Sequence, residues 1–171
     1  MTQKVAIVTG SSSGMGFETS LILARNGFYT YATMRKLQGE GSKQLTDISK
    51  NENLPLQIIR LDVNDDKSVK DAIDAIVKEK DGIDVVVNNA GYDLMGALEE
   101  TSMEELKGQF ETNLFGAVRV LQAVIPIMRK QKGGTIVNIT SLGGRVSFPL
   151  NSAYHATKLL LRGYLNLYSM N

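Results

Sequence analysis

The chain has 171 residues, of which 19 are lysine or arginine and 18 are aspartate or glutamate. This balance gives no electrostatic case for a nucleic-acid or membrane-surface partner, and the absence of cysteine excludes disulfides and thiolate metal sites. No apolar stretch reaches the length of a membrane span, and Met1 leads directly into the first expected strand without a signal peptide. We therefore expect a cytoplasmic protein. We expect no metal site, because the chain has one histidine, and one histidine cannot build such a site.

Short apolar runs alternate with amphipathic stretches along the chain. They predict strands near 4 to 9, 29 to 34, 57 to 61, 84 to 88 and 134 to 140, and helices near 14 to 26, 40 to 50, 66 to 80, 102 to 131 and from about 152. Gly39 and Gly41 make the start of the second helix uncertain. The helix near 102 to 131, with Pro126 in its C-terminal part, is long enough to be broken or kinked. The alternation predicts one α/β domain over residues 1–171, a doubly wound parallel sheet with helices on both faces.

A glycine-rich turn joins the first expected strand to the first expected helix, and it reads Thr9-Gly10-Ser11-Ser12-Ser13-Gly14-Met15-Gly16. Gly10 suits a tight turn, Gly14 leaves room for a pyrophosphate against the backbone, and Gly16 lets the helix pack closely on the sheet. The first N–H groups of the helix would then point at the anion. The alternative is a serine–glycine loop that only joins two elements.

The end of the second strand bears on the choice of dinucleotide. A site that prefers NAD places an acidic side chain there, to accept hydrogen bonds from the ribose 2′-hydroxyl. This strand instead ends in Met34-Arg35-Lys36. Arg35 offers a planar fork for a 2′-phosphate, Lys36 adds positive charge, and the hydroxyl of Ser11 or Ser12 could join them. The sequence predicts NADP(H) rather than NAD(H), although Arg35 and Lys36 could also form a solvated turn.

Three side chains near the C-terminus suggest hydride-transfer chemistry. Tyr154 and Lys158 stand at i and i+4 on one helix face, so the ammonium can favour the ionised phenol. Ser141 ends the last apolar run, where its hydroxyl could hydrogen-bond the oxygen of a reacting alcohol or carbonyl beside that phenol. His155 points about 100° away from Tyr154 on the helix, and we expect it to be a surface or packing residue.

Five elements occur here in one order: T-G-x-x-x-G-x-G from Thr9, N-N-A-G from Asn88, a single asparagine at Asn113, the serine Ser141, and Y-x-x-x-K from Tyr154. From position 4 to about 158 the chain thereby resembles the short-chain dehydrogenase/reductase family. The resemblance implies a Rossmann-like fold with strand order 3-2-1-4-5, a small carbonyl or alcohol substrate and a homo-oligomer, dimer or tetramer.

The resemblance also implies residue roles. Ser141 would polarise the substrate, Tyr154 would act as acid and base, Lys158 would also contact the nicotinamide ribose, and Asn113 would hold a water for proton relay to the lysine. Asp62 and Val63 match the adenine contact, although Asp62 could instead cap the helix that starts near Asp65. The motifs and the resemblance together assign cofactor contacts to Gly10, Ser11, Ser12, Ser13, Gly14, Met15, Gly16, Arg35, Lys36, Asp62, Val63, Asn89, Ala90, Gly91, Tyr154 and Lys158.

The resulting hypothesis is an NADP(H)-dependent oxidoreductase that interconverts a carbonyl and a secondary alcohol. Two alternatives stay open. One is an epimerase or dehydratase of the same family that retains its nucleotide, and the other is a non-catalytic dinucleotide-binding or regulatory protein or an inactive truncated product.

The tail after Lys158 departs from the family pattern, which continues into two more strands that this chain lacks. Permitted codons for Leu159 to Tyr168, read in a shifted frame, can spell the family's A-V-E-G-L-S-E-S-L. We therefore hypothesise that a single-base frameshift replaced the C-terminus, and that the chain ending at Asn171 binds NADP(H) with weak or no turnover. The fifth strand would become an exposed sheet edge.

Overall fold

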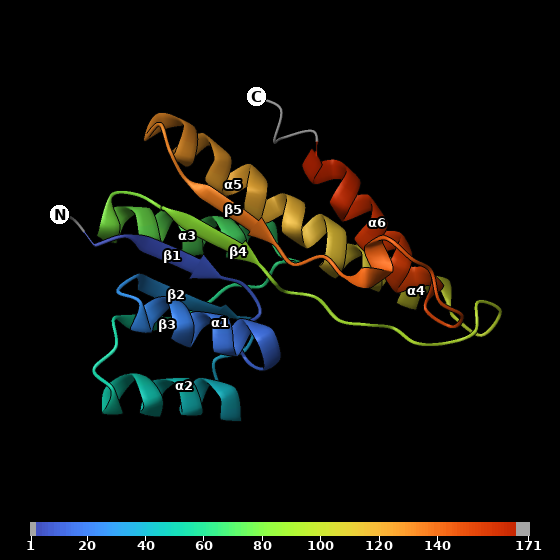
Figure 1. Ribbon diagram of the computed structural model, residues 1–171, viewed down its shortest axis with the longest axis horizontal. Helices are drawn as coiled ribbons and strands as arrows, with labels where there is room; N and C mark the ends of the chain where they lie inside the picture. The colour runs from blue at the N-terminus through green and yellow to red at the C-terminus, as the bar shows by residue number, and fades with distance from the viewer. Residues whose placement is uncertain (1–2, 167–171) are drawn as a thin grey trace.

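Five parallel strands form the sheet of this computed structural model, which describes residues 3–166 (Figure 1). They are β1 (Val5–Val8), β2 (Tyr29–Met34), β3 (Leu56–Arg60), β4 (Val85–Asn88) and β5 (Thr135–Asn138), in the order β3-β2-β1-β4-β5. The predicted strand order is confirmed, and each strand begins and ends within two residues of its predicted range. The apolar runs located the strands well because a parallel strand covered on both faces must be apolar throughout.

Helices cover both faces of the sheet, as predicted (Figure 1). On one face, Leu21 of α1 (Gly14–Arg25) and Leu45 of α2 (Glu40–Asn51) pack against Ala32 and Met34 of β2. On the other, α3 (Asp66–Lys80) and α5 (Gly116–Lys130) bury apolar side chains against β1, β2 and β4, among them Ile73. The sheet is thus held rigid between two apolar layers, and its strand ends are fixed in space.

The long helix predicted near 102 to 131 is broken, but not at Pro126. It consists of α4 (Met103–Phe110), a π-helical segment η1 (Glu111–Phe115) and α5, which runs through Pro126 without interruption. A π turn inserts extra backbone into a helix and rotates the side chains that follow it. The change in helix type therefore occurs at the segment that contains Asn113, and not at the proline.

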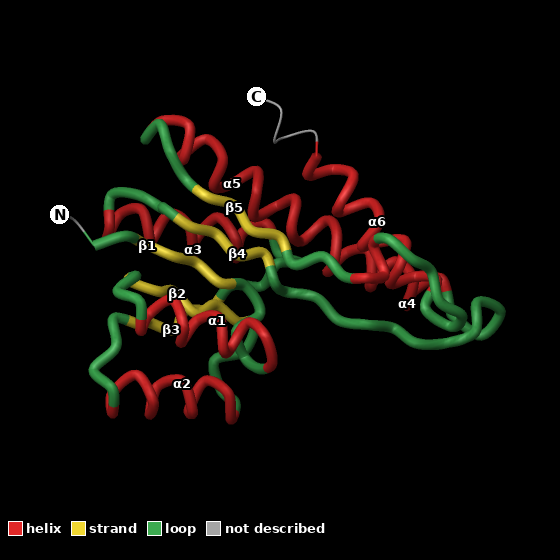
Figure 2. Tube along the Cα trace, in the orientation of Figure 1, coloured by secondary structure: helices red, strands yellow, loops and turns green. Residues whose placement is uncertain are grey.

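The segments that follow β4 and β5 extend together to one end of the molecule, beside α4 and α6 (Ser152–Asn166) (Figure 2). The backbone N–H of Gly96 in the first segment donates to the carbonyl of Leu150 in the second at 2.8 Å. A short 3-10 helix, η2 (Leu142–Gly144), lies at the start of the second segment and packs against α6. Two sequence-distant segments thus flank the carboxyl ends of the strands. Within residues 3–166, no helix combines the length and apolar character needed to cross a bilayer.

Candidate active site

A cavity of about 510 Å³ opens at the carboxyl ends of the strands, where β1 is flanked by β2 and β4. The chain leaves β1 toward one side of the sheet and returns at β4 on the other, so the loops after these strands diverge and leave a crevice. The cavity is lined by most of the residues with an expected site role, namely Gly10, Ser12, Ser13, Gly14, Met15, Arg35, Asp62, Val63, Asn89, Ala90, Gly91, Tyr154 and Lys158.

The glycine turn has the geometry that its spacing suggests. Gly10 and Gly14 have positive φ angles of 69° and 58°. A Cβ at Gly16 would lie 2.4 Å from the carbonyl oxygen of Gly10 and 2.4 Å from Nδ2 of Asn89, so only glycine allows α1 to pack this closely. A Cβ at Gly14 would have no neighbour within 4 Å, which leaves open space at the N-terminus of α1. This space and the helix N-terminus suit a phosphate group.

The two serines proposed as partners of Arg35 differ in the structure. The hydroxyl of Ser11 is fully buried, donates to the carbonyl of Val8 at 2.9 Å and lies 3.0 Å from the hydroxyl of Ser20, which donates to it. Ser11 therefore supports the turn from inside and offers no hydroxyl to the cavity. Ser12, by contrast, is exposed and lines the cavity together with Arg35. Lys36 is exposed but lies outside the cavity wall.

Thr9 has a role for which the sequence offered only its place in the motif. Its hydroxyl oxygen accepts hydrogen bonds from the backbone N–H groups of Asn89 and Ala90, both at 3.0 Å. Asn89 in turn donates from Nδ2 to the carbonyls of Thr9 at 2.9 Å and Gly10 at 3.2 Å. These bonds join the loop after β1 to the loop after β4, and they hold both walls of the cavity at a fixed separation.

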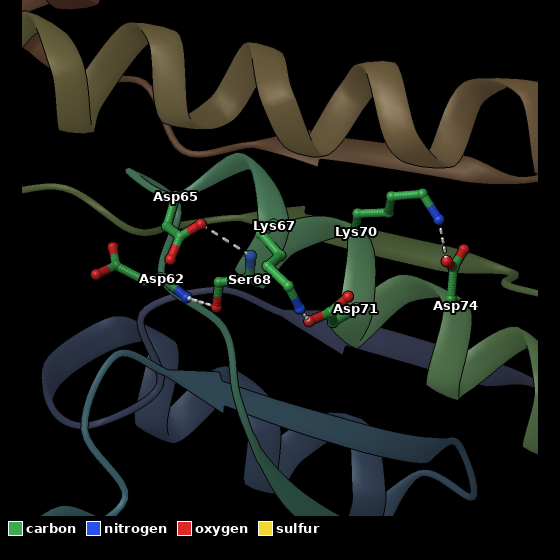
Figure 3. A network of polar contacts seen from close by, with 7 residues as sticks. All are labelled: Asp62, Asp65, Lys67, Ser68, Lys70, Asp71 and Asp74. Atoms are coloured by element: carbon green, nitrogen blue, oxygen red, sulfur yellow. Dashed lines mark hydrogen bonds and ion pairs between the residues drawn. The ribbon is translucent and has the colours of Figure 1, made fainter.

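Asp62 and Val63 follow β3 and line the cavity, and Asp62 is half-buried in the loop before α3 (Figure 3). Asp62 Oδ1 accepts from the backbone N–H of Asn64 at 3.1 Å, and its own N–H donates to Ser68 Oγ at 3.0 Å. Asp65 is the residue that caps α3, because its carboxylate accepts from the N–H of Ser68 at 3.1 Å. The alternative in which Asp62 caps this helix is wrong, and Asp62 keeps its position on the cavity wall.

Further along α3, Lys67 pairs with Asp71 and Lys70 with Asp74 on the exposed surface (Figure 3). Each pair is spaced i, i+4 and is exposed, so solvent screens the attraction and the pair adds little to helix stability. These pairs therefore belong to the solvated face of α3 and have no part in the site.

Tyr154 and Lys158 both reach the cavity from the first turns of α6. The Lys158 ammonium lies 5.6 Å from the centre of the Tyr154 ring and donates to the carbonyl of Ile139 at 2.8 Å. Lys158 is only 5% exposed, and burial lowers the pKa of its ammonium because the charged form loses hydration. Tyr154 and Lys158 thus lie together at the cavity, and the carbonyl of Ile139, just after β5, accepts a hydrogen bond from the lysine.

Ser141 lies at the start of η2, half-buried and just outside the cavity wall. Its Oγ accepts from the backbone N–H of Gly143 at 3.1 Å. Because the hydroxyl is the acceptor in this bond, it keeps its own hydrogen for donation to another oxygen.

Asn113 is buried in η1, and its side chain is bonded to the chain itself. Oδ1 accepts from the N–H of Tyr92 at 3.0 Å, while Nδ2 donates to the carbonyl of Tyr92 at 2.8 Å and to Thr157 Oγ1 at 3.4 Å. A Cβ at Gly91 would lie 3.0 Å from Asn113 Oδ1 and 3.8 Å from Lys158 Nζ, so the three residues converge. The Asn113 side chain therefore positions the segment after β4, and its part in a proton relay stays a prediction.

Gln109, one helical turn before Asn113, was not foreseen from the sequence. It is fully buried, accepts from the N–H of Leu94 at 2.9 Å through Oε1, and donates through Nε2 to the carbonyl of Tyr92. The sequence feature that could have indicated Gln109 is its position four residues before Asn113, which places both polar side chains on one helix face. Gln109 and Asn113 together hold Tyr92, a residue of the cavity wall.

His155 is a packing residue, one of the two alternatives expected. It is 4% exposed and lies against the segment that follows β5.

Comparison with known proteins gives the following matches. The family model described as short chain dehydrogenase matches residues 4–170. A 3-ketodihydrosphingosine reductase of Bacteroides thetaiotaomicron is 36% identical over 165 residues, which are 96% of this chain and 56% of the relative. Human retinol dehydrogenase 8 is 36% identical over 163 residues, 94% of this chain and 51% of the relative. A crystal structure of an actinorhodin polyketide ketoreductase variant with NADPH superposes with a TM-score of 0.91 at 29% identity, covering 98% of this chain and 66% of that one.

The chain thus spans about half the length of these curated relatives. The segment after Lys158 is helical as far as Asn166 and is included in the family match, while residues 167–171 lie outside the described part of the chain. The frameshift hypothesis stays a prediction. An independent DNA read through the Lys158 codon tests it: a shifted frame that continues into S-E-S-L and two further strands would support it, and a confirmed stop with no strand-like sequence downstream would contradict it.

Proposed function

The chain belongs to the short-chain dehydrogenase family, and on that premise we propose that it has the architecture of an NADP(H)-dependent oxidoreductase that interconverts a carbonyl and a secondary alcohol. One observation carries the proposal. Tyr154 and Lys158 line the same cavity as the glycine turn that follows β1. An acid–base pair and an anion-binding turn at one crevice favour chemistry on a substrate held beside a dinucleotide.

The proposed roles follow from the chemistry of each group. A bound nicotinamide dinucleotide would give hydride to the carbonyl carbon or take it from the alcohol carbon. In reduction, Tyr154 donates its phenolic proton to the substrate oxygen, and in oxidation its phenolate removes the hydroxyl proton. Lys158 places a positive charge on the same cavity wall as Tyr154, and Ser141 donates a hydrogen bond to the substrate oxygen, where negative charge develops. Asn113 and Gln109 keep the segment after Gly91 in place.

The preference for NADP(H) over NAD(H) is the finer part of the proposal. Two features support it: no carboxylate stands at the end of β2, and Arg35 and the exposed Ser12 line the same cavity. A guanidinium can bind a 2′-phosphate through two parallel hydrogen bonds, whereas a 2′-hydroxyl gains little from it.

Fluorescence titration of the 171-residue protein with NADPH and NADH tests this preference. We expect tighter NADPH binding, and an Arg35→Ala variant that loses about tenfold or more in NADPH affinity, roughly 1.4 kcal/mol, with NADH affinity little changed. Arg129→Ala, which removes an exposed arginine from the last turn of α5, is the matched control and should change neither. Tighter binding of NADH would overturn the assignment.

A single-turnover experiment, with protein in excess over NADPH and a ketone present, tests the reaction itself. We expect slow NADPH oxidation with one alcohol formed per NADPH, and a loss of about 100-fold or more in Tyr154→Phe, the range of general acid–base catalysis. Turnover without a stoichiometric nicotinamide absorbance change would favour an epimerase or dehydratase. NADPH binding with no chemistry in either protein would favour a non-catalytic dinucleotide-binding or regulatory protein or an inactive truncated product.

We further propose that the substrate is apolar. The segments after β4 and β5, which begin at the cavity, expose large apolar side chains, including Met95, Leu98, Leu142 and Phe148. Two of the similar proteins are named for a keto-lipid and for retinol, which supports the same substrate class. A series of methyl ketones of increasing chain length should react with rising kcat/KM, whereas a flat series would contradict the proposal.

We propose a cytoplasmic homo-oligomer that acts on a small molecule and has no nucleic-acid or membrane partner. The near balance of 19 basic and 18 acidic residues supports this setting, and the family resemblance supports the oligomer. Light scattering after size-exclusion chromatography tests the assembly, and a monomeric mass at micromolar concentration would contradict it. Subcellular fractionation tests the location.

A further inference from the structure

His155 is a buried titratable residue without a role in the proposed reaction. It lies between Tyr154 and Lys158 on α6, and it is 4% exposed. A buried histidine is usually hydrogen-bonded, because an unpaired ring nitrogen inside the protein costs free energy. The partner of this ring therefore indicates what the residue does.

The ring of His155 is bonded to the segment that follows β5. Its Nδ1 lies 3.1 Å from the backbone nitrogen of Phe148, which donates to it. The rings of Phe148 and His155 also pack against one another, with centres 5.6 Å apart and a tilt of 59°. Because Nδ1 accepts the bond, Nδ1 carries no hydrogen. The ring is then in the tautomer with its hydrogen on Nε2.

The other edge of the ring lies against η2. A Cβ at Gly143 would come within 2.4 Å of His155 Cδ2, so glycine alone fits between the backbone and the ring. The N–H of the same glycine donates to Ser141 Oγ. His155 thus lies against Gly143, the residue whose N–H bonds to the Ser141 hydroxyl, and it directly follows Tyr154 along α6.

The segment between Ser141 and Leu150 is held at its ends by other groups. Arg162 Nη1 donates to the carbonyl of Gly144 at 3.3 Å near the beginning, and Gly96 donates to the carbonyl of Leu150 at the end. Between these two anchors, Arg145, Val146 and Ser147 are exposed, and the bond to His155 ties the middle of the segment to α6.

We propose that His155 is a positioning residue that sets the place of the Ser141 hydroxyl relative to Tyr154. It does so by accepting the Phe148 N–H and by packing its ring edge on Gly143. The role in catalysis rests on the proposed function. The hydrogen bond and ring contact between His155 and Phe148, which we call the clasp, do not depend on it.

Nitrogen-15 NMR of the unmodified protein tests the clasp directly. Long-range nitrogen–proton couplings of the imidazole should report the tautomer with hydrogen on Nε2, and the Phe148 amide should exchange with solvent at least about tenfold more slowly than the exposed amides beside it. A ring protonated on Nδ1, or a rapidly exchanging Phe148 amide, would overturn the proposal. Neither measurement needs a substrate, so both decide the clasp even if the proposed reaction fails.

Two variants test the link to catalysis. His155→Asn keeps an acceptor oxygen close to the place of Nδ1, whereas His155→Leu has similar bulk and no acceptor. We expect His155→Leu to lower kcat about tenfold or more with little change in the Kd for NADPH, and His155→Asn to restore both kcat and the slow exchange of Phe148. Equal kcat in all three proteins would overturn the positioning role. A His155→Leu variant that does not fold leaves the comparison of His155→Asn with the unmodified protein, in which retained kcat with a fast Phe148 amide would also overturn it.

Discussion

Burial of Lys158 lowers the free energy of unfolding while its ammonium is charged. Burial lowers the pKa of this ammonium, so between that lowered value and the ordinary value near 10.5 the unfolded chain binds more protons than the folded one. In this interval the stability contributed by Lys158 rises with pH, and below it the full cost of the buried charge is present. Each unit by which the pKa is lowered corresponds to about 1.4 kcal/mol.

The corresponding prediction concerns Lys158→Met, which removes the buried charge. Its free energy of unfolding, relative to that of the unmodified protein, should be most favourable near pH 7 and should fall as the pH rises toward 10. Urea unfolding at three pH values measures this difference. Lys130→Met, at an exposed position in the last turn of α5, should show no such trend, and a pH-independent difference for Lys158→Met would contradict the prediction.

Two glycines provide a second residue-scale prediction. A methyl group at Gly16 would collide with the Gly10 carbonyl and the Asn89 amide, whereas one at Gly163, an exposed position inside α6, would have no neighbour within 4 Å. We expect Gly16→Ala to lower the free energy of unfolding by about 1–3 kcal/mol and to weaken NADPH binding. Gly163→Ala should raise it by about 0.5–1 kcal/mol with binding unchanged. Chemical denaturation and NADPH titration check both, and equal effects of the two substitutions would refute this reading of the turn.

At the scale of elements, β5 is one of the two edge strands of the described sheet. Its outer backbone groups form a ladder onto which another strand can add, and Val137 is 41% exposed on the face opposite Ile136. Ile136 packs against the main core. The strand therefore combines an exposed edge with one exposed and one buried side.

We predict that Val137→Lys lowers aggregation of the 171-residue protein at 37 °C by several-fold, since a charge at an edge opposes strand addition. Ile136→Lys, one position away on the buried side, should instead lower the free energy of unfolding by about 2 kcal/mol or more. Light scattering over time and urea unfolding give the two readouts. If Val137→Lys aggregates as fast as the unmodified protein, the edge is not the cause.

The whole molecule is expected to unfold as one unit, because β1 and β4 contribute to the core and the loops that follow them line the cavity. NADPH at a hundredfold excess over its Kd should then add about 2.7 kcal/mol to the free energy of unfolding. For a chain of this length the Tm should rise by roughly 5–10 °C in one transition. Calorimetry with and without NADPH measures this, and two separate transitions, only one of them shifted, would contradict a single domain over residues 1–171.

Much of the fold followed from local sequence. The strand positions and the glycine turn were predicted because apolar runs and glycine spacing are features of neighbouring residues, whereas the strand order was implied by the family resemblance. The i, i+4 spacing predicted that Tyr154 and Lys158 share one helix face, and the family resemblance implied that both contact the cofactor. The bounds of the long helix were less well determined, because Pro126 is tolerated and the break occurs at η1.

The remaining features were decided only by contacts between distant segments. Whether Ser11 or Ser12 faced the cavity, whether Asp62 or Asp65 capped α3, and whether His155 lay at the surface all depended on which groups the fold brought beside them. Gln109 and Asn113 gained their roles from Tyr92, which is far away along the chain. A sequence determines the chemistry that each side chain can perform, but the partner that satisfies a buried polar atom is known only when the tertiary structure places it there.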